Sequence, residues 1–274
     1  MKNAFARKTS VLLLTLALPL AAQAHKAWLQ PSKTVLNVGQ WITVDAGAST
    51  EPFVKDHNAF RLDQLAITAP DGSRVAPENL VGGKLRNSFD LQLQQAGTYR
   101  LAVVSDGISA SWQEQGQRRS WPPRGQPFTA EGFAKEVPAK AEQLKLTQSQ
   151  RRIETFVTSG KPSEGALKPS GVGLELVPVS GVNDLYTGET ARFRLLLDGR
   201  PAAGVGVELV PDGQRYRNAV GELQRVTDAE GVFSVDWTQP GLWWLSASVE
   251  DRRATVPATE RRASYTATLE VLSP

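Results

Sequence analysis

The chain has 274 residues, with 31 Lys and Arg against 28 Asp and Glu, and it contains no cysteine. The absence of cysteine excludes disulfides, thiolate metal sites and cysteine nucleophiles. The single methionine is Met1, so the rest of the chain offers no soft sulfur ligand of the kind that favours Cu(I).

Residues 1–24 have the three-part layout of a secretory signal peptide. A basic start precedes an apolar run at 11–20, and small residues end at Ala24. The apolar run is about ten residues long, which is too short to span a bilayer as a helix. We therefore expect cleavage after Ala24, a periplasmic mature chain that begins at His25, and no direct insertion into a membrane.

Removal of this segment changes the charge balance. It holds three basic residues and no acidic one, so the mature chain keeps 28 basic residues against 28 acidic residues. The basic isoelectric point of about 9.2 then belongs to the precursor. Since the mature protein has no excess positive charge, we exclude nucleic acid as a partner.

Alternating apolar and polar segments, typical of β-strands, dominate the chain. In the pair 88–93 and 98–104, apolar residues occupy every second position on both sides of a turn at 94–97. This pattern predicts a β-hairpin with one buried face. A further strand is expected at 153–158.

The segment 113–150 differs from its surroundings. Residues 115–125 are polar, basic and Pro-rich, and 130–146 is the most helix-like stretch, so we expect a partly helical insertion. Within it, the sequence from Trp121 to Arg124 is compatible with a mobile flap, a docking segment, or a surface loop held by one buried tryptophan.

We predict an all-β fold of two β-sandwich domains. The N-terminal sandwich covers 25–160 and includes the insertion at 113–150, a linker follows at 161–171, and the C-terminal sandwich covers 172–274. Seven strands are expected in the second sandwich, at 174–177, 191–197, 205–210, 223–227, 232–237, 242–249 and 265–271. This half resembles the transthyretin-like and immunoglobulin-like modules of exported proteins, which implies a scaffold role.

The chain has two histidines, His25 and His57. After cleavage before His25, the free α-amine and the ring Nδ1 of that residue can chelate one metal ion, and His57 can supply a third nitrogen. Such a histidine brace suits Cu(II) and is acceptable to Ni(II). The alternative is that His57 is an ordinary surface-loop histidine and that His25 stands first by chance.

Two carboxylates are candidate supports for this site. Asp56 precedes His57 directly, so it could ligate the metal or orient the ring of His57. Glu154 is a further candidate oxygen ligand. Other chemistry has little support, because no nucleophile elbow or phosphate-binding loop is present. Most of the seven tryptophans lie in alternating segments, which favours core positions over a carbohydrate-binding surface.

Several segments resemble the DUF4198 family, exported bacterial proteins that are often labelled periplasmic components of nickel or cobalt transport. The resemblance rests on the motifs that begin at His25, at Trp41, at Asp56-His57 and at Glu154, and on the segment 173–185. It implies a Gram-negative periplasmic setting and a divalent transition metal, carried here by His25, Asp56 and His57. Family members often have an acidic residue after the terminal histidine, where this chain has Lys26.

Three functions are compatible with the sequence. The first is a periplasmic protein that binds Cu(II), Ni(II) or Co(II) and passes the ion to a membrane transporter. The second is a copper-dependent oxidase with a histidine brace beside a flat substrate face. The third is an interaction module that binds a partner or an envelope glycan, with both histidines incidental.

Overall fold

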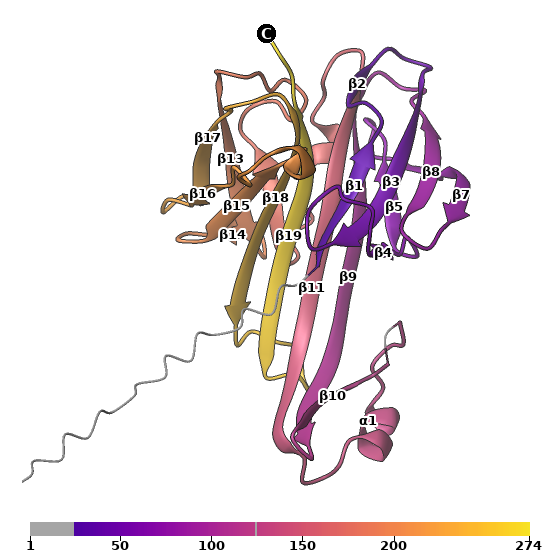
Figure 1. Ribbon diagram of the computed structural model, residues 1–274, viewed down its shortest axis with the longest axis vertical. Coiled ribbons are helices and arrows are strands. Elements are labelled where there is room, and N and C mark those ends of the chain that lie inside the picture. The colour runs from indigo at the N-terminus through magenta and orange to yellow at the C-terminus, as the bar shows by residue number, and fades with distance from the viewer. Residues whose placement is uncertain (1–24, 124) are drawn as a thin grey trace, which may run out of the picture.

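The computed structural model describes residues 25–123 and 125–274, and the fold is all-β (Figure 1). The predicted signal peptide at 1–24 and its cleavage site lie outside or at the border of the described residues. Within the described ranges, none of the helices has the length and apolar character needed to cross a bilayer.

The described residues form three sheets. The five-stranded sheet has the order β1-β3-β8-β7, with β4 paired to β3. Its strands are β1 (Lys26–Pro31), β3 (Trp41–Ser49), β4 (Asn58–Ala59), β7 (Glu78–Gly82) and β8 (Asn87–Gln92). The four-stranded sheet consists of β12 (Leu174–Pro178), β13 (Thr190–Leu197), β14 (Arg200–Pro201) and β17 (Val232–Asp236).

The ten-stranded sheet runs through the whole molecule. Its order is β16-β15-β18-β19-β11-β9-β5-β6, with β10 paired to β9 and β2 paired to β11. The strands are β2 (Val35–Leu36), β5 (Leu65–Thr68), β6 (Arg74–Val75), β9 (Gly97–Glu114), β10 (Gln117–Trp121), β11 (Glu142–Ser159), β15 (Gly206–Pro211), β16 (Leu223–Val226), β18 (Gly241–Asp251) and β19 (Glu260–Val271).

The ten-stranded sheet is shared by two sandwiches that use its opposite faces. Strand β11 shows this directly, because Ile153 packs into the core under the five-stranded sheet and Phe156 packs into the core under the four-stranded sheet. Residues at odd spacing along a strand point to opposite faces. The structure thus confirms the predicted all-β fold of two sandwiches.

The two cores follow the sequence order. The first draws its buried side chains from residues 27–157, and the second from residues 156–271. Strands β11 and β19 join them, since they pair in parallel from Thr147↔Glu260 to Thr155↔Thr268. The segment predicted as a linker, 161–171, contains the 3-10 turn Gly165–Leu167, whose Ala166 is buried.

The hairpin prediction for 88–93 and 98–104 is wrong. Both segments are strands with the expected buried alternation, but β8 pairs with β3 and β7, whereas β9 pairs with β5, β10 and β11. The turn between them crosses from one sheet to the other. Gly97 permits this crossing, because it has φ +133° and an added Cβ would lie 2.5 Å from the Cβ of Pro70. Alternation shows which face is buried, but not which strand is the partner.

The insertion is the tip of a long ribbon. Strands β9 and β11 extend together beyond the two sandwiches and carry β10 and α1 (Ala130–Glu136) at their end (Figure 1). The helix is shorter than the predicted 130–146, because Pro138 follows it and β11 begins at Glu142. Trp121 lies against Phe128 and Phe133, with ring centroids 5.2 and 6.3 Å away, so the tip has a small core of its own.

Candidate functional site

The topology brings His25 and His57 to the same end of β3. Strands β1 and β4 pair antiparallel with β3, with Lys26 opposite Ser49 and Asn58 opposite Ala48. Each histidine directly precedes one of these flanking strands. Their exposed rings stack with centroids 3.9 Å apart and planes inclined by 10°. The two histidines, 32 positions apart in sequence, therefore form one surface pair.

The stacked arrangement differs from a metal-bound arrangement. The lone pair of an imidazole nitrogen lies in the ring plane, so two parallel rings cannot aim their lone pairs at one ion. Because both side chains are exposed, rotation of a ring between side-chain rotamers meets little packing. The pair is thus close enough to share an ion after one ring turns.

Asp56 holds the loop that carries His57. Its carboxylate accepts a hydrogen bond of 2.6 Å from the hydroxyl of Ser49, at the end of β3. The same loop is anchored by Phe53, which has a positive φ of 65° and lies with its ring centroid 5.9 Å from that of the buried Trp28. The contact of Asp56 with Ser49 thus fastens the loop before His57 to the end of β3.

Lys26 directs its charge away from the histidine pair. Its ammonium lies 2.8 Å from a carboxylate oxygen of Glu208 on β15, and 4.8 Å from the ring centroid of Trp244. The cation next to His25 is therefore partly neutralised by an acidic residue of the second sandwich. This contact also ties the first residue of β1 to the ten-stranded sheet.

Glu154 lies in the interior and not at the histidine pair, so its prediction as an oxygen ligand is wrong. It is 1% exposed and accepts hydrogen bonds of 3.0 Å from both Arg152 and the hydroxyl of Tyr265. Burial, followed by the nearby charge of Glu154, raises the pKa of Tyr265 well above its ordinary value. Glu154 therefore belongs to a buried network of ionic contacts and hydrogen bonds.

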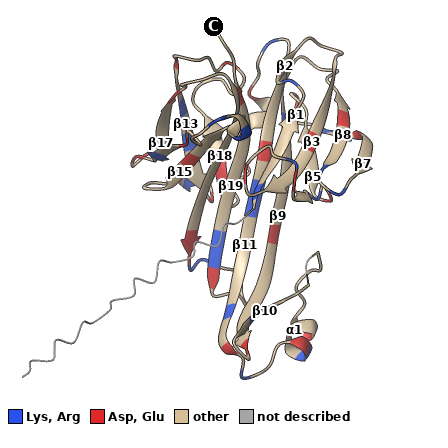
Figure 2. Cartoon of the chain, in the orientation of Figure 1, with Lys and Arg blue, Asp and Glu red and all other residues tan. Residues whose placement is uncertain are grey.

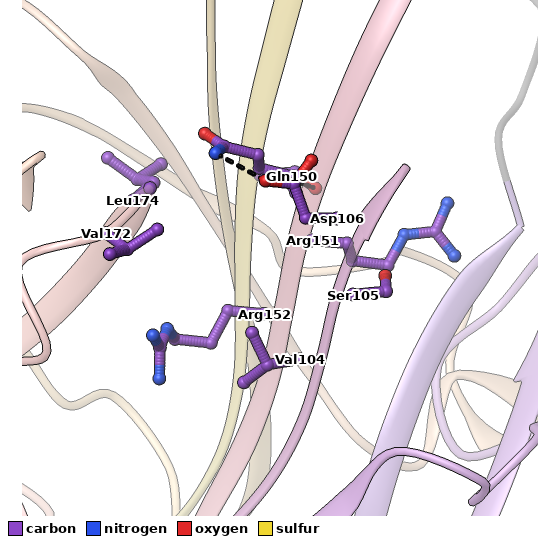
Figure 3. A pocket seen from close by; sticks show the side chains of 10 residues that line it. Val104, Ser105, Asp106, Gln150, Arg151, Arg152, Val172 and Leu174 are labelled. Carbon is purple, nitrogen blue, oxygen red and sulfur yellow. Dashed lines mark hydrogen bonds between the residues drawn. The ribbon is translucent and has the colours of Figure 1, made fainter. Parts of the chain in front are cut away.

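The direction in which side chains of β11 point explains why Glu154 lies apart from the histidine pair. Figure 3 shows Arg152 pointing toward Val172 and Leu174 of the second sandwich, while Arg151 points to the other side of the strand. Glu154 shares the side of Arg152 because the two residues are two positions apart. The cavity drawn there is small, and its Gln150 donates a hydrogen bond of 2.9 Å to Asp106.

Two larger cavities flank the histidine pair. One, of about 470 Å³, is lined by His57 and Asp56, and the other, of about 690 Å³, is lined by His25 and Lys26. Thr50 and Glu51 line both cavities, and Arg215 also lines the cavity beside His57. Sequence reasoning missed Glu51, which follows the last residue of β3 by two positions.

Side chains alone do not complete a metal site in the described residues. Across 25–123 and 125–274, no three side chains from His, Asp and Glu are grouped closely enough to hold an ion. In the full-length chain, the backbone nitrogen of His25 is part of the peptide bond to Ala24. The pair therefore offers two ring donors here, and an amine donor arises only by cleavage before His25.

Comparison with solved structures finds matches of low sequence identity and low TM-score. The D0-D1 domain of intimin is 11% identical, with a TM-score of 0.23, over 90% of this chain and 100% of that chain. The Yersinia pseudotuberculosis adhesin InvE is 12% identical, with a TM-score of 0.22, over 88% and 58%. A titin fragment, I67-I69, is 10% identical, with a TM-score of 0.20, over 92% and 68%. These likenesses support no inference about function.

Comparison with curated proteins finds no match. The family model of DUF4198, described as a domain of unknown function, matches residues 22–251. This range includes both histidines, the whole five-stranded sheet and most of the second sandwich. Because the match covers more than half of the sequence, the chain belongs to the DUF4198 family.

Proposed function

We propose that the mature chain is a periplasmic protein that binds one divalent transition-metal ion, Cu(II), Ni(II) or Co(II), through His25 and His57. The stacking of these two rings at 3.9 Å carries the proposal, because it brings together the two histidines of the chain. The α-amine of His25, freed by signal-peptide cleavage, is the third donor.

The donor set fits such an ion. Imidazole and amine nitrogens are borderline ligands that suit Cu(II), Ni(II) and Co(II). A free α-amine has an ordinary pKa of about 7.7–8.0 and gives up its proton readily when a cation competes for the lone pair. Glu51 lines the cavities on both sides of the pair and adds negative charge near the site, where Arg215 adds a positive charge on the His57 side.

The location of the site suits capture and transfer of an ion. Both histidines are exposed at the end of β3, so an ion held there is reachable by a partner protein. Burial of a metal beneath a lid would slow such a transfer. The ion is therefore cargo in this proposal, and the partner is a membrane transporter for the same metal.

The most direct test of the proposal concerns the α-amine of His25. We would compare Cu(II) and Ni(II) binding by calorimetry and chelator competition for protein that begins at His25 and for protein with one added N-terminal methionine. We expect one equivalent of metal on the first protein and an affinity lower by more than about 100-fold on the second, since a ligand is lost outright. His57→Ala should weaken binding to a similar degree, and Glu78→Gln, on the exposed strand β7, serves as the control.

Equal affinity with and without the added methionine would contradict the three-nitrogen site. Mass spectrometry of the exported protein gives an independent check, since cleavage anywhere except before His25 would remove the chelating amine. Reductant-dependent peroxide production by the copper-loaded protein would instead identify an oxidase.

A further inference from the structure

One face of the ten-stranded sheet carries rows of hydroxyl side chains. The register places them side by side across four strands, with Ser248 opposite Ser264, Ser246 opposite Thr266, and Thr147 opposite Ser109. Arg151 connects the rows, since it lies between Ser264 on β19 and Ser105 on β9. We call this surface the hydroxyl face, and its residues are Ser105, Ser109, Ser111, Thr147, Ser149, Ser246, Ser248, Ser264 and Thr266.

The hydroxyl face lies on the same side of the sheet as the five-stranded sheet. Ile153 and Val103, which are paired across β11 and β9, point to this side and pack under the five-stranded sheet. The five-stranded sheet ends at its edge strand β1, and beyond β1 it no longer covers this face. Apart from Thr266, which is buried, the hydroxyl face is therefore the uncovered continuation of a packed sheet face, and His25 stands at its margin.

Two neighbouring cavities lie along this face. The cavity of about 690 Å³ beside His25 and a cavity of about 760 Å³ nearer the tip both include Ser149 and Arg262 in their walls. The positions from Ile153 to Lys145 on β11 span about 26 Å at a rise of about 3.3 Å per residue. Because they share two wall residues, we treat the two cavities together as one long open groove.

The lining is unlike the core of a protein interface. Such cores are built around aromatic and large apolar anchors, whereas the largest apolar side chains of this groove, Trp244 and Ile153, are themselves buried and Val220 alone of its large apolar residues is exposed. Hydroxyl groups both donate and accept hydrogen bonds, as do the hydroxyls of a sugar. The groove therefore offers many adaptable polar contacts.

The charges of the groove are largely paired with one another. Arg262 lies 3.8 Å from Glu250, Lys145 lies 3.8 Å from Glu260, and Lys26 lies 2.8 Å from Glu208. Figure 2 shows basic and acidic residues next to one another along the extended parts of β18 and β19. This internal neutralisation disfavours a polyanion, because a polyanion gains most from unpaired cations.

From these observations we infer that the groove of the hydroxyl face binds an extended neutral glycan, which would lie along β11 and β19 with one end near His25. The face is at least four strands wide, and its serine and threonine side chains are small enough for a sugar ring to rest directly on the sheet. The metal plays no part in this inference.

The test uses metal-free protein that begins at His25, with a chelator present. The probes are neutral six-unit oligosaccharides, with and without N-acetyl groups, and a six-unit uronic-acid oligosaccharide as the anionic comparison. We expect saturable binding of at least one neutral probe by calorimetry and by shifts of backbone amide NMR signals in β11 and β19. Ser149→Trp and Ser248→Trp, both at exposed positions, should each weaken binding by about tenfold or more by filling the groove.

Ser234→Trp is the matched control, because Ser234 is an exposed strand residue of the four-stranded sheet. It should bind like the unmodified chain, and Ser149→Thr should retain most of the affinity. Circular dichroism verifies that each variant is folded. Failure of every neutral probe to bind, binding of the uronic-acid probe alone, or unchanged affinity in both groove variants would overturn the inference. None of these results would bear on metal binding by His25 and His57.

Discussion

The indole Nε1 of Trp244 donates a hydrogen bond of 2.9 Å to the carbonyl oxygen of Ala27, across 217 positions of sequence. Trp244 is buried on β18, and Ala27 is two residues after His25 on β1. The second sandwich therefore fixes the strand that presents the first histidine. Lys26 reinforces the same contact through Glu208.

We predict that Trp244→Phe destabilises the fold and loosens the metal site. The carbonyl of Ala27 loses its buried donor, which should lower the free energy of unfolding by about 1–3 kcal/mol. Denaturant unfolding measures this loss, and metal affinity should fall with it. Trp41→Phe is the control, since Trp41 is 48% exposed and its replacement should change stability by less than about 0.5 kcal/mol. Equal losses in the two variants would refute the role of the hydrogen bond.

Asp56 should influence metal binding through Ser49. We expect Asp56→Ala and Ser49→Ala to weaken metal binding by similar factors, each of about tenfold, because each removes the same hydrogen bond. The double variant should lose little more than either single variant, as expected for residues in one network. A much larger loss in Asp56→Ala than in Ser49→Ala would show instead that Asp56 ligates the ion directly.

Arg152 neutralises two buried carboxylates. Its guanidinium lies 3.0 Å from Glu154 and 3.2 Å from Glu175. Arg152→Met should lower the free energy of unfolding by about 3–5 kcal/mol, because it leaves buried charge without its partner. Lys145→Met breaks an exposed pair with Glu260 and should cost less than about 1 kcal/mol. Urea unfolding of both variants gives the comparison, and a similar small cost for both would contradict the network.

Acid should weaken the contact between Asp251 and Arg261. The hydrogen bond from Arg261 holds the pKa of Asp251 below its ordinary value. The resulting stability is present above the unfolded pKa of about 3.9 and is lost as the pH falls through the lower folded pKa. The difference in melting temperature between the unmodified chain and Asp251→Asn should therefore shrink from pH 6 to pH 2.5. A difference that stays constant or grows would contradict this origin of the pKa shift.

The strand positions were largely predictable, because half-buried strands leave a period of two in the sequence. The pairing of those strands was not. Residues 88–93 and 98–104 have the same pattern whether they form a hairpin or face each other across a core. The parallel contact of β11 with β19 has no local signal at all, since it joins residues 113 positions apart, such as Thr147 and Glu260.

Of the candidate site, only the histidines were predictable as a pair, because histidine is rare in this sequence. His25 and His57 could be proposed together because the chain has two histidines. Glu154 is excluded from the candidate metal site by the face of β11 to which it points. Glu51 lies near that site because of the path of the loop after β3. Both are properties of the fold that a single sequence does not encode locally.

The sharing of the ten-stranded sheet also affects the order in which the chain can fold. Strand β11 meets β9 early in the chain, but its other neighbour, β19, begins only at Glu260. Until that segment has been synthesised and delivered, one side of β11 is an open edge with unpaired backbone groups, which invites association with other chains. A nascent or truncated chain that ends before Glu260 is therefore the form most in need of a chaperone.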